Sequence, residues 1–246
     1  MSITRENTLV IVPAYNEAAS IAQVIDELKS YGYHVLVVSD GSRDQTCKIA
    51  REMGVRVLEL PINLGVGGAL RAGFRVAVRE NYAAIVQVDA DGQHPAHEIE
   101  SLLDAANQNS AHLVIGSRFL SNGTSMEVGV TRRLVMKVLA RSSSRATGIS
   151  ITDTTSGFRV ICEPLLTKFS NSFPTNYLGD TYEAVVAAGR SGYKVIEIPA
   201  ALRERTAGKS TATISQSVRF TVKGLVVVAL RLHQQLEKFY ETKSEV

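Results

Sequence analysis

Cysteine is scarce in this chain and forms no recognisable pattern. Only two cysteines occur among 246 residues. Cys47 and Cys162 lie far apart in the sequence and belong to neither a CxxC pair nor another metal-ligand spacing. A disulfide framework is therefore not expected, and the cysteine usage favours a reducing, cytoplasmic location.

Long blocks of a single charge are also missing. The chain has 27 Lys and Arg residues against 24 Asp and Glu residues, which gives a formal net charge of +3 at pH 7. The charges are interspersed, whereas an arm that binds nucleic acid would gather its Lys and Arg residues. We expect no nucleic-acid partner.

No apolar run is long enough to cross a bilayer. The longest apolar stretch near the C-terminus, Gly224–Leu230, is bounded by Lys223 and Arg231, whereas a crossing helix needs about 20 residues. The N-terminal segment Met1–Thr8 lacks the basic region, apolar stretch and cleavage site of a signal peptide. We expect a cytoplasmic protein that is at most peripheral at the inner face of the membrane.

No internal repeat, low-complexity segment or shift in composition marks a domain boundary. Hydrophobic residues make up 45% of the chain, which is enough to bury a substantial core in a single domain of this length. We expect this domain to span residues 1–214, with residues 215–246 forming a C-terminal amphipathic helix and tail of the same domain.

The first half of the chain alternates short apolar runs with helical patterns. The runs predict buried strands and the intervening segments predict helices, so the alternation indicates an α/β fold with a mostly parallel central sheet. Ligands of such folds bind at the carboxyl ends of the strands. The predicted strands are Leu9–Val12, Val35–Val38, Val55–Leu58, Ala84–Val88 and Leu113–Ile115, and the predicted helices are Ser20–Ser30, Asp44–Met53, Gly67–Glu80 and His97–Gln108.

The second half is less regular and resembles a lobe that shapes a substrate site. An irregular segment contains Asp153–Arg159. The remaining elements expected here are helices at Thr131–Thr147, Asp180–Ser191 and Ser215–Glu237 and a strand at Lys194–Ile198.

Two carboxylates follow the fourth predicted strand. Alternate residues of an extended segment share a face, so Asp89 and Asp91, with the Gln93 carbonyl, can converge on one hard cation such as Mg²⁺ or Mn²⁺. The alternative is a solvated turn, because Asp-Gly is a common turn dipeptide. The neighbouring His94 and His97 lack thiolates and a four-ligand spacing, so we interpret them as surface or helix-start residues rather than as zinc ligands.

The first and second predicted strands also end in polar residues. PAYNE at 13–17 and SDGSRD at 39–44 supply carboxylates that can accept hydrogen bonds from a base or ribose, and the Tyr15 ring can pack against a base. Ordinary turns between strand and helix are the alternative. The glycine-rich NLGVGGALR at 63–71 is neither a Walker A sequence nor a dinucleotide fingerprint.

Taken together, PAYNE at 13–17, DGS at 40–42, NLG at 63–65 and DAD at 89–91 resemble, in this order, the family-2 glycosyltransferases with the GT-A fold. The later motifs DGQHP at 91–95, GSRF at 116–119, DTTSGFR at 153–159 and RTAGKS at 205–210 resemble the polyprenyl-phosphate branch, which includes the dolichyl-phosphate mannose synthases. The resemblance covers about Leu9 to Ser210. It implies a GT-A-type, Rossmann-like three-layer sandwich that binds a nucleotide-sugar donor.

The resemblance also implies roles for particular residues. Pro13, Tyr15, Glu17, Val38 and Asp40 would hold the nucleotide. Asp89, Asp91 and Gln93 would hold Mg²⁺ or Mn²⁺, and Ala90 would line the donor site. Arg118, Arg132, Arg133 and Arg205 would bind donor and acceptor phosphates, because guanidinium groups bind phosphate through paired contacts.

Two positions depart from the family pattern. Ser39 stands where many relatives have the first Asp of an Asp-Asp-Gly-Ser run, and Thr211 stands where the dolichyl branch has a phosphate-binding Lys, with Lys209 close by. The nucleotide and the phosphate contacts are therefore left open.

The leading hypothesis is an inverting transfer to a polyprenyl phosphate. A phosphate nucleophile is already ionised, so Asp91 and Arg118 would contribute through charge stabilisation and positioning. Transfer to a hydroxyl of a saccharide in cell-surface polysaccharide synthesis would instead need a base. Asp180 and Glu183 are candidates, although acidic residues also favour a first helical turn. A catalytically silent sugar-nucleotide sensor would need a broken metal motif, and both aspartates are intact.

The C-terminal segment has an amphipathic pattern. Apolar residues such as Leu225, Leu232 and Leu236 alternate with basic residues such as Lys223 and Arg231. A helix of this kind can lie on a membrane surface, dock on a small membrane-anchor protein, or pack on the domain core.

Overall fold

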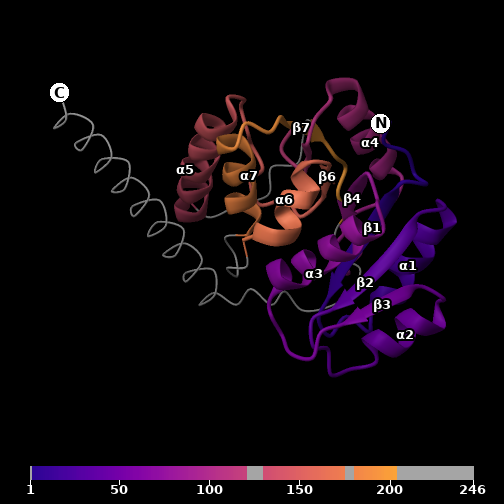
Figure 1. Ribbon diagram of the computed structural model, residues 1–246. Helices are drawn as coiled ribbons and strands as arrows, with labels where there is room; N and C mark the ends of the chain where they lie inside the picture. Colours follow the sequence, from indigo (N-terminus) through magenta and orange to yellow (C-terminus); the bar gives the residue numbers. More distant parts are fainter. Residues whose placement is uncertain (1, 121–129, 175–179, 204–246) are drawn as a thin grey trace, which may run out of the picture.

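A computed structural model describes residues 2–120, 130–174 and 180–203 of the chain (Figure 1). The predicted final helix at Ser215–Glu237 lies outside the described residues. None of the helices in these three ranges combines the length and the apolar character that crossing a membrane requires.

A seven-stranded sheet forms the centre of the molecule, in the order β3-β2-β1-β4-β6-β5-β7. All neighbouring strands pair in parallel except β6, which runs antiparallel to both β4 and β5. The mostly parallel sheet predicted from the sequence is confirmed. The strands are β1 (Thr8–Ala14), β2 (His34–Ser39), β3 (Arg56–Glu59), β4 (Ala84–Gln87), β5 (Leu113–Ser117), β6 (Arg159–Cys162) and β7 (Val195–Pro199).

Helices cover both faces of the sheet, which gives the expected three layers (Figure 1). One face packs against α1, α2 and α4, and the other packs against α3, α6 and α7. Helix α5 lies on α7, outside the sheet contacts. The helices are α1 (Ile21–Ser30), α2 (Thr46–Glu52), α3 (Val66–Arg79), α4 (Glu98–Asn109), α5 (Val130–Thr147), α6 (Leu165–Ser172) and α7 (Asp180–Arg190).

The side chains of the buried strands alternate between two hydrophobic cores, one on each face of the sheet. In β1, Val10 and Val12 face the α1 side, whereas Leu9 and Ile11 face the α3 side. All four are at most 1% exposed, and full burial of such a side chain contributes about 1.5–3 kcal/mol. Strands that are apolar on both faces must lie inside a covered sheet.

Two elements were not predicted. Strand β6 begins with a charged residue, Arg159, and spans only four residues, so it offers little apolar pattern. Helix α6 follows Pro164 directly and spans eight residues. Both fall within the second half of the chain, where the sequence suggested an irregular lobe.

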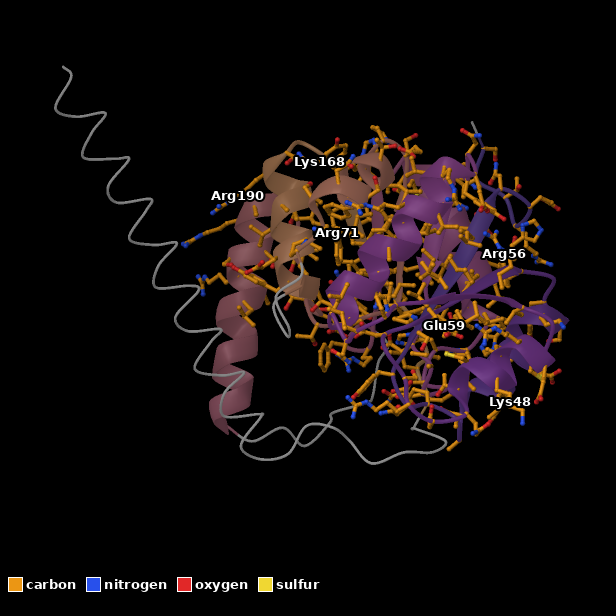
Figure 2. The ribbon with its side chains drawn as sticks, turned by 60° about the horizontal axis from the view of Figure 1, so that its bottom comes forward. Lys48, Arg56, Glu59, Arg71, Lys168 and Arg190 are labelled. Carbon is orange, nitrogen blue, oxygen red and sulfur yellow. The ribbon has the colours of Figure 1, made fainter. Side chains whose placement is uncertain are left out.

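Charged side chains are distributed widely over the described surface. Figure 2 shows Lys48 of α2 and Arg56 of β3 on one side of the molecule and Lys168 of α6 and Arg190 of α7 on the other. Several have local partners. Arg56, for example, donates two hydrogen bonds of 2.6 Å to Glu80.

Candidate active site

The polar motifs meet at one edge of the sheet. The carboxyl ends of β1, β2, β4, β5 and β7 lie at the same edge because these strands run in parallel. The antiparallel strand β6 brings its amino end, and with it the segment Asp153–Gly157, to this edge. Residues from both halves of the sequence therefore surround the same site.

Asp91 lies in a turn that begins at Ala90, and Asp89 stands between the end of β4 and this turn. Strand β4 ends at Gln87, and Gly92 takes a left-handed φ of 78°. Within the turn, the Gln93 N–H donates a hydrogen bond of 3.0 Å to Asp91 Oδ1. The chain therefore turns at Ala90–Asp91 instead of staying extended through Asp91 as the sequence suggested, and both carboxylates follow the end of β4.

Asp89 is held by neighbours from its own turn and from the segment before β6. His94 Nδ1 accepts a hydrogen bond of 3.0 Å from the Asp89 main-chain N–H, and His94 Nε2 lies 3.7 Å from Asp89 Oδ2. Gln87 Nε2 lies 3.4 Å from Asp89 Oδ1. A Cβ on Gly157 would lie only 2.8 Å from Asp89 Oδ2, so the carboxylate rests directly against the glycine backbone.

The interpretation of His94 as a surface or helix-start residue is wrong. Its side chain is only 4% exposed, and its ring stacks on the buried Phe158 with centroids 4.9 Å apart. Burial lowers the pKa of His94, against the opposing attraction of Asp89 and Asp91. By contrast, His97 occupies the N-cap position of α4, as expected for a helix-start residue.

Arg118 forms a paired contact with a buried carboxylate. Its Nε and Nη2 donate to Asp153 Oδ2 and Oδ1 at 2.8 and 2.9 Å, and Nη2 also donates to Thr155 Oγ1 at 2.9 Å. Burial would raise the pKa of Asp153, but the hydrogen bonds and charge of Arg118 outweigh it and lower that pKa. The negative charge of Asp89 also helps to raise the pKa of Arg118, so the Arg118–Asp153 pair interacts electrostatically with the aspartate turn.

The segment that carries Asp153 is anchored on the last strand. Glu197 of β7 accepts main-chain hydrogen bonds from Thr152 at 2.7 Å and from Asp153 at 2.6 Å. The fully buried Arg159 donates to the main-chain oxygens of Thr154 and Thr181. The backbone around Asp153 is therefore fixed from two sides.

The second strand end is tied to the glycine-rich loop. Asp40 Oδ1 accepts a hydrogen bond of 2.7 Å from the Leu64 N–H. Gly41 has a φ of 70°, and a Cβ there would lie 2.9 Å from the main-chain N of Asn63. A larger residue would therefore push the loop away from β2. Tyr15 is 45% exposed, and the N–H of the next residue, Asn16, donates to Ser42 Oγ in the turn after β2 at 3.2 Å.

Gln93 connects the aspartate turn to the segment after β7. Its carbonyl accepts a hydrogen bond of 2.9 Å from the Arg203 N–H, and its side-chain Nε2 lies 3.4 Å from the Arg203 carbonyl. The Arg203 guanidinium in turn pairs with Glu27 at 2.8 Å. The predicted metal ligand thus also holds the chain where it leads toward Arg205 and Lys209.

The structure does not bring every predicted residue to the site. The side chains of Val38 and Ala90 lie in the cores, at 0% and 4% exposure. Pro13 and Glu17 lie at the end of β1 and are partly exposed. Arg132 and Arg133 belong to α5 and Asp180 opens α7, but their side chains are outside the described part, as are Arg205 and Lys209 entirely.

Sequence reasoning missed three contributors to this site. Gly157 and Asp153 appeared only as parts of a motif, and His94 was assigned to the surface. A signal for His94 was present, because it lies five residues after Asp89 in a tight turn that contains Gly92.

The donor set suits a hard divalent cation that is shared with a substrate. The described residues contain no group of three or more His, Cys, Asp or Glu side chains that could hold a metal by themselves. Mg²⁺ is usually bound by one or two carboxylates together with substrate phosphates and water. Asp89, at 38% side-chain exposure, and Asp91 fit that arrangement.

Comparison with known proteins identifies the family of this chain. The model of the family described as glycosyl transferase family 2 matches residues 9–169, and the chain belongs to that family. The motifs at the ends of β1, β2 and β4 all lie within the matched range.

Curated relatives cover most of the chain. A polyprenol monophosphomannose synthase of Mycolicibacterium smegmatis is 34% identical over 83% of this chain and 80% of the relative. An undecaprenyl-phosphate mannosyltransferase of Micrococcus luteus is 30% identical over 82% of this chain and 86% of the relative.

The fold also matches a solved structure. Glucosyl-3-phosphoglycerate synthase of Mycobacterium tuberculosis, in complex with Mn²⁺, uridine diphosphate and phosphoglyceric acid, superimposes with a TM-score of 0.68 at 20% identity. The match covers 91% of this chain and 78% of the synthase. At this identity the likeness establishes the GT-A fold.

Proposed function

We propose that this chain transfers a sugar, with inversion, from a nucleotide-sugar donor to a polyprenyl phosphate in a reaction that depends on Mg²⁺ or Mn²⁺. The observation that carries the proposal is the match over four fifths of the chain to relatives named for polyprenol and undecaprenyl phosphate. The alternative, transfer to a saccharide hydroxyl, has no comparable support among these relatives.

In the proposed reaction the aspartate turn binds the metal. Asp89 and Asp91, with Gln93, would hold the cation together with the donor diphosphate. When bound, the cation would neutralise charge on the departing nucleoside diphosphate. The turn can perform this task because its backbone is fixed by the Asp91–Gln93 hydrogen bond and by the contact of Gln93 with Arg203.

The ends of β1 and β2 would bind the nucleotide. Tyr15 offers an exposed ring for the base, and Pro13 and Glu17 lie on the same strand end. Asp40 is mostly buried and accepts the Leu64 N–H, so we assign it a double role, in which it shapes the glycine-rich loop and offers its carboxylate to the nucleotide. Ser39, in place of the more common Asp, hydrogen bonds to Ser42 at 3.0 Å.

Cationic side chains would bind the phosphates of the two substrates. Arg118 is 30% exposed, and Asp153 holds its guanidinium through the Nε and Nη2 edge, so the group is oriented without searching other rotamers. Arg132, Arg133, Arg205 and Lys209 are proposed for the same task from the sequence motifs. Two anionic substrates must approach each other here, and arginines together with a cation reduce their repulsion.

No general base is required if the acceptor is a phosphate. Its oxygen is ionised at neutral pH and can attack the anomeric carbon directly, so catalysis depends on positioning and charge stabilisation. Asp180, at the start of α7, is retained as the candidate base for the hydroxyl alternative.

We further propose that residues 1–214 act as one domain at the cytoplasmic face of a membrane, with residues 215–246 as its attachment to the lipid.

Product partitioning tests the acceptor. The protein is incubated with MgCl₂ or MnCl₂, GDP-mannose, UDP-glucose or UDP-N-acetylglucosamine, and either a polyprenyl phosphate or a free saccharide. We expect labelled sugar in the organic phase with the lipid phosphate and none without a divalent metal. Labelled saccharide in the aqueous phase, with no labelled lipid, would replace this proposal by the hydroxyl alternative.

A further inference from the structure

Asp89 depends on a buried side chain that sequence motifs do not assign. His94 contacts Asp89 at two points, because its Nδ1 accepts the main-chain N–H at 3.0 Å and its Nε2 lies 3.7 Å from Oδ2. Since Nδ1 accepts this hydrogen bond, the ring carries its proton on Nε2, on the side of the carboxylate.

The His94 ring itself is immobilised. It is almost completely buried and lies nearly parallel to Phe158, with an interplanar angle of 25°. Phe158 is fully buried and adjoins Gly157, whose missing Cβ leaves space for the Asp89 carboxylate. Gln87 approaches the other carboxylate oxygen at 3.4 Å.

We propose that His94 is a positioning residue which, with Gly157, fixes the Asp89 carboxylate in the orientation that binds the divalent cation. This inference rests on the proposed metal role of Asp89. Groups that orient a metal ligand commonly change metal affinity by about 10–100-fold when they are replaced. The carboxylate is 38% exposed, so without these neighbours solvent would allow it several rotamers.

Three substitutions separate the features of His94. His94→Phe keeps a ring that can stack on Phe158 and removes both polar contacts. His94→Asn retains an acceptor near the Nδ1 position, whereas His94→Gln retains a donor near the Nε2 position. Gly157→Ala tests the same carboxylate independently, because its Cβ would lie 2.8 and 3.0 Å from the two Asp89 oxygens. His97→Phe, at the half-exposed start of α4, is the matched control.

Binding of Mn²⁺ is measured by the loss of the free-ion signal in electron paramagnetic resonance, with MnCl₂ alone and with UDP or GDP added. We expect His94→Phe and Gly157→Ala to raise the Mn²⁺ dissociation constant by about ten-fold or more. His94→Asn and His94→Gln should recover part of the affinity, and His97→Phe should match the unsubstituted protein. Melting curves show whether each variant is folded, and the Asn and Gln variants keep the test valid if His94→Phe does not fold.

The outcomes distinguish this inference from the proposed function. If Asp89→Asn weakens Mn²⁺ binding but folded His94 and Gly157 variants bind as the unsubstituted protein does, only the positioning role is overturned. If the unsubstituted protein binds no Mn²⁺ under any of these conditions, both the metal proposal and this inference are overturned.

Discussion

Asp91 is a buried carboxylate with a local structural bond, and both properties matter when it is substituted. It is 5% exposed, and its Oδ1 accepts the Gln93 N–H. We expect Asp91→Asn to lower transfer by about 100-fold or more, since loss of a ligand should cost at least as much as loss of a group that orients one. The Asn oxygen can still accept the Gln93 N–H, so the melting temperature should change little. If Asp91→Asn turned over at nearly the rate of the unsubstituted protein, Asp91 would not be a metal ligand.

Arg118 and Asp153 form a partly buried ion pair in which the carboxylate has no exposed surface. Among the residues that the structure describes, Arg118→Ala leaves Asp153 with Thr155 as its one side-chain hydrogen-bond partner. Loss of one member of a buried pair costs about 3–5 kcal/mol. We therefore expect this variant to lose stability as well as lipid-phosphate turnover, measured by denaturant unfolding at pH 7. Arg118→Lys should restore part of both losses, because it keeps the charge without the paired contact.

The same pair determines the sign of a pH effect. Arg118 lowers the pKa of Asp153 in the folded state, so its stabilisation is complete above the unfolded value of about 3.9 and is lost as the pH falls through the folded value. The difference in stability between the unsubstituted protein and Arg118→Ala should therefore shrink as the pH is lowered below about 4. A difference that does not vary with pH would show that the ion pair contributes nothing to folding.

The connection between β2 and the start of α3 depends on a glycine. Gly41 has a left-handed φ of 70° and touches the backbone of the loop at Ile62 and Asn63. Gly41→Ala should displace this loop, break the Asp40–Leu64 bond and lower the affinity for the donor nucleotide by about ten-fold, equivalent to about 1.4 kcal/mol. Calorimetric titration with UDP and GDP in the presence of Mg²⁺ measures the effect.

Gly192, which follows α7, provides the control for Gly41→Ala. It has a comparable φ of 78°, but a Cβ there would meet nothing within 4 Å. Gly192→Ala should therefore show the cost of backbone strain in its melting curve without a change in nucleotide affinity. If both variants bound the nucleotide as tightly as the unsubstituted protein, the glycine-rich loop would have no role in donor binding.

Element by element, the sequence anticipated the first half of the chain well, because its strands are buried on both faces and its helices have a clear apolar side. Val10 and Val12 alternate with Leu9 and Ile11 toward two cores, and this pattern needs no long-range information. Strand β6 escaped notice because its charged first residue, Arg159, is buried through hydrogen bonds to the main-chain oxygens of the nearby Thr154 and of Thr181 in α7. Such bonds exist only in the folded chain.

The candidate site was likewise predicted where local sequence motifs determine it and missed where it depends on contacts between remote segments. Motifs placed Asp89, Asp91 and Arg118 correctly at strand ends, since a polar residue after a buried strand must emerge at the sheet edge. They gave no indication that Asp153 would align Arg118, because the antiparallel strand β6 brings these two residues together. The position of His94 beside Asp89 was signalled only by the tight turn that contains Gly92. The side chain of Val38 faces the core, so the predicted contact of this residue with the nucleotide would have to come from its main chain.

At the scale of the whole molecule, the C-terminal pattern suggests how a lipid acceptor reaches the site. If residues 215–246 attach the domain to a membrane, deletion after Ser215 should abolish sedimentation with anionic liposomes and lower activity on a long-chain lipid phosphate. Activity on a short soluble analogue should remain. If the segment instead packs on the domain, the truncated protein should melt earlier and lose activity on both acceptors.

The central claim is that a phosphate oxygen, rather than a hydroxyl, receives the sugar. Phosphorus nuclear magnetic resonance observes this atom directly during turnover with a nucleotide-sugar donor, Mg²⁺ and a polyprenyl phosphate. We expect the monoester resonance of the lipid phosphate to be replaced by a diester resonance at the same rate as the nucleoside diphosphate appears. Asp91→Asn should abolish both changes. Release of the nucleoside diphosphate with an unchanged lipid monoester would contradict it.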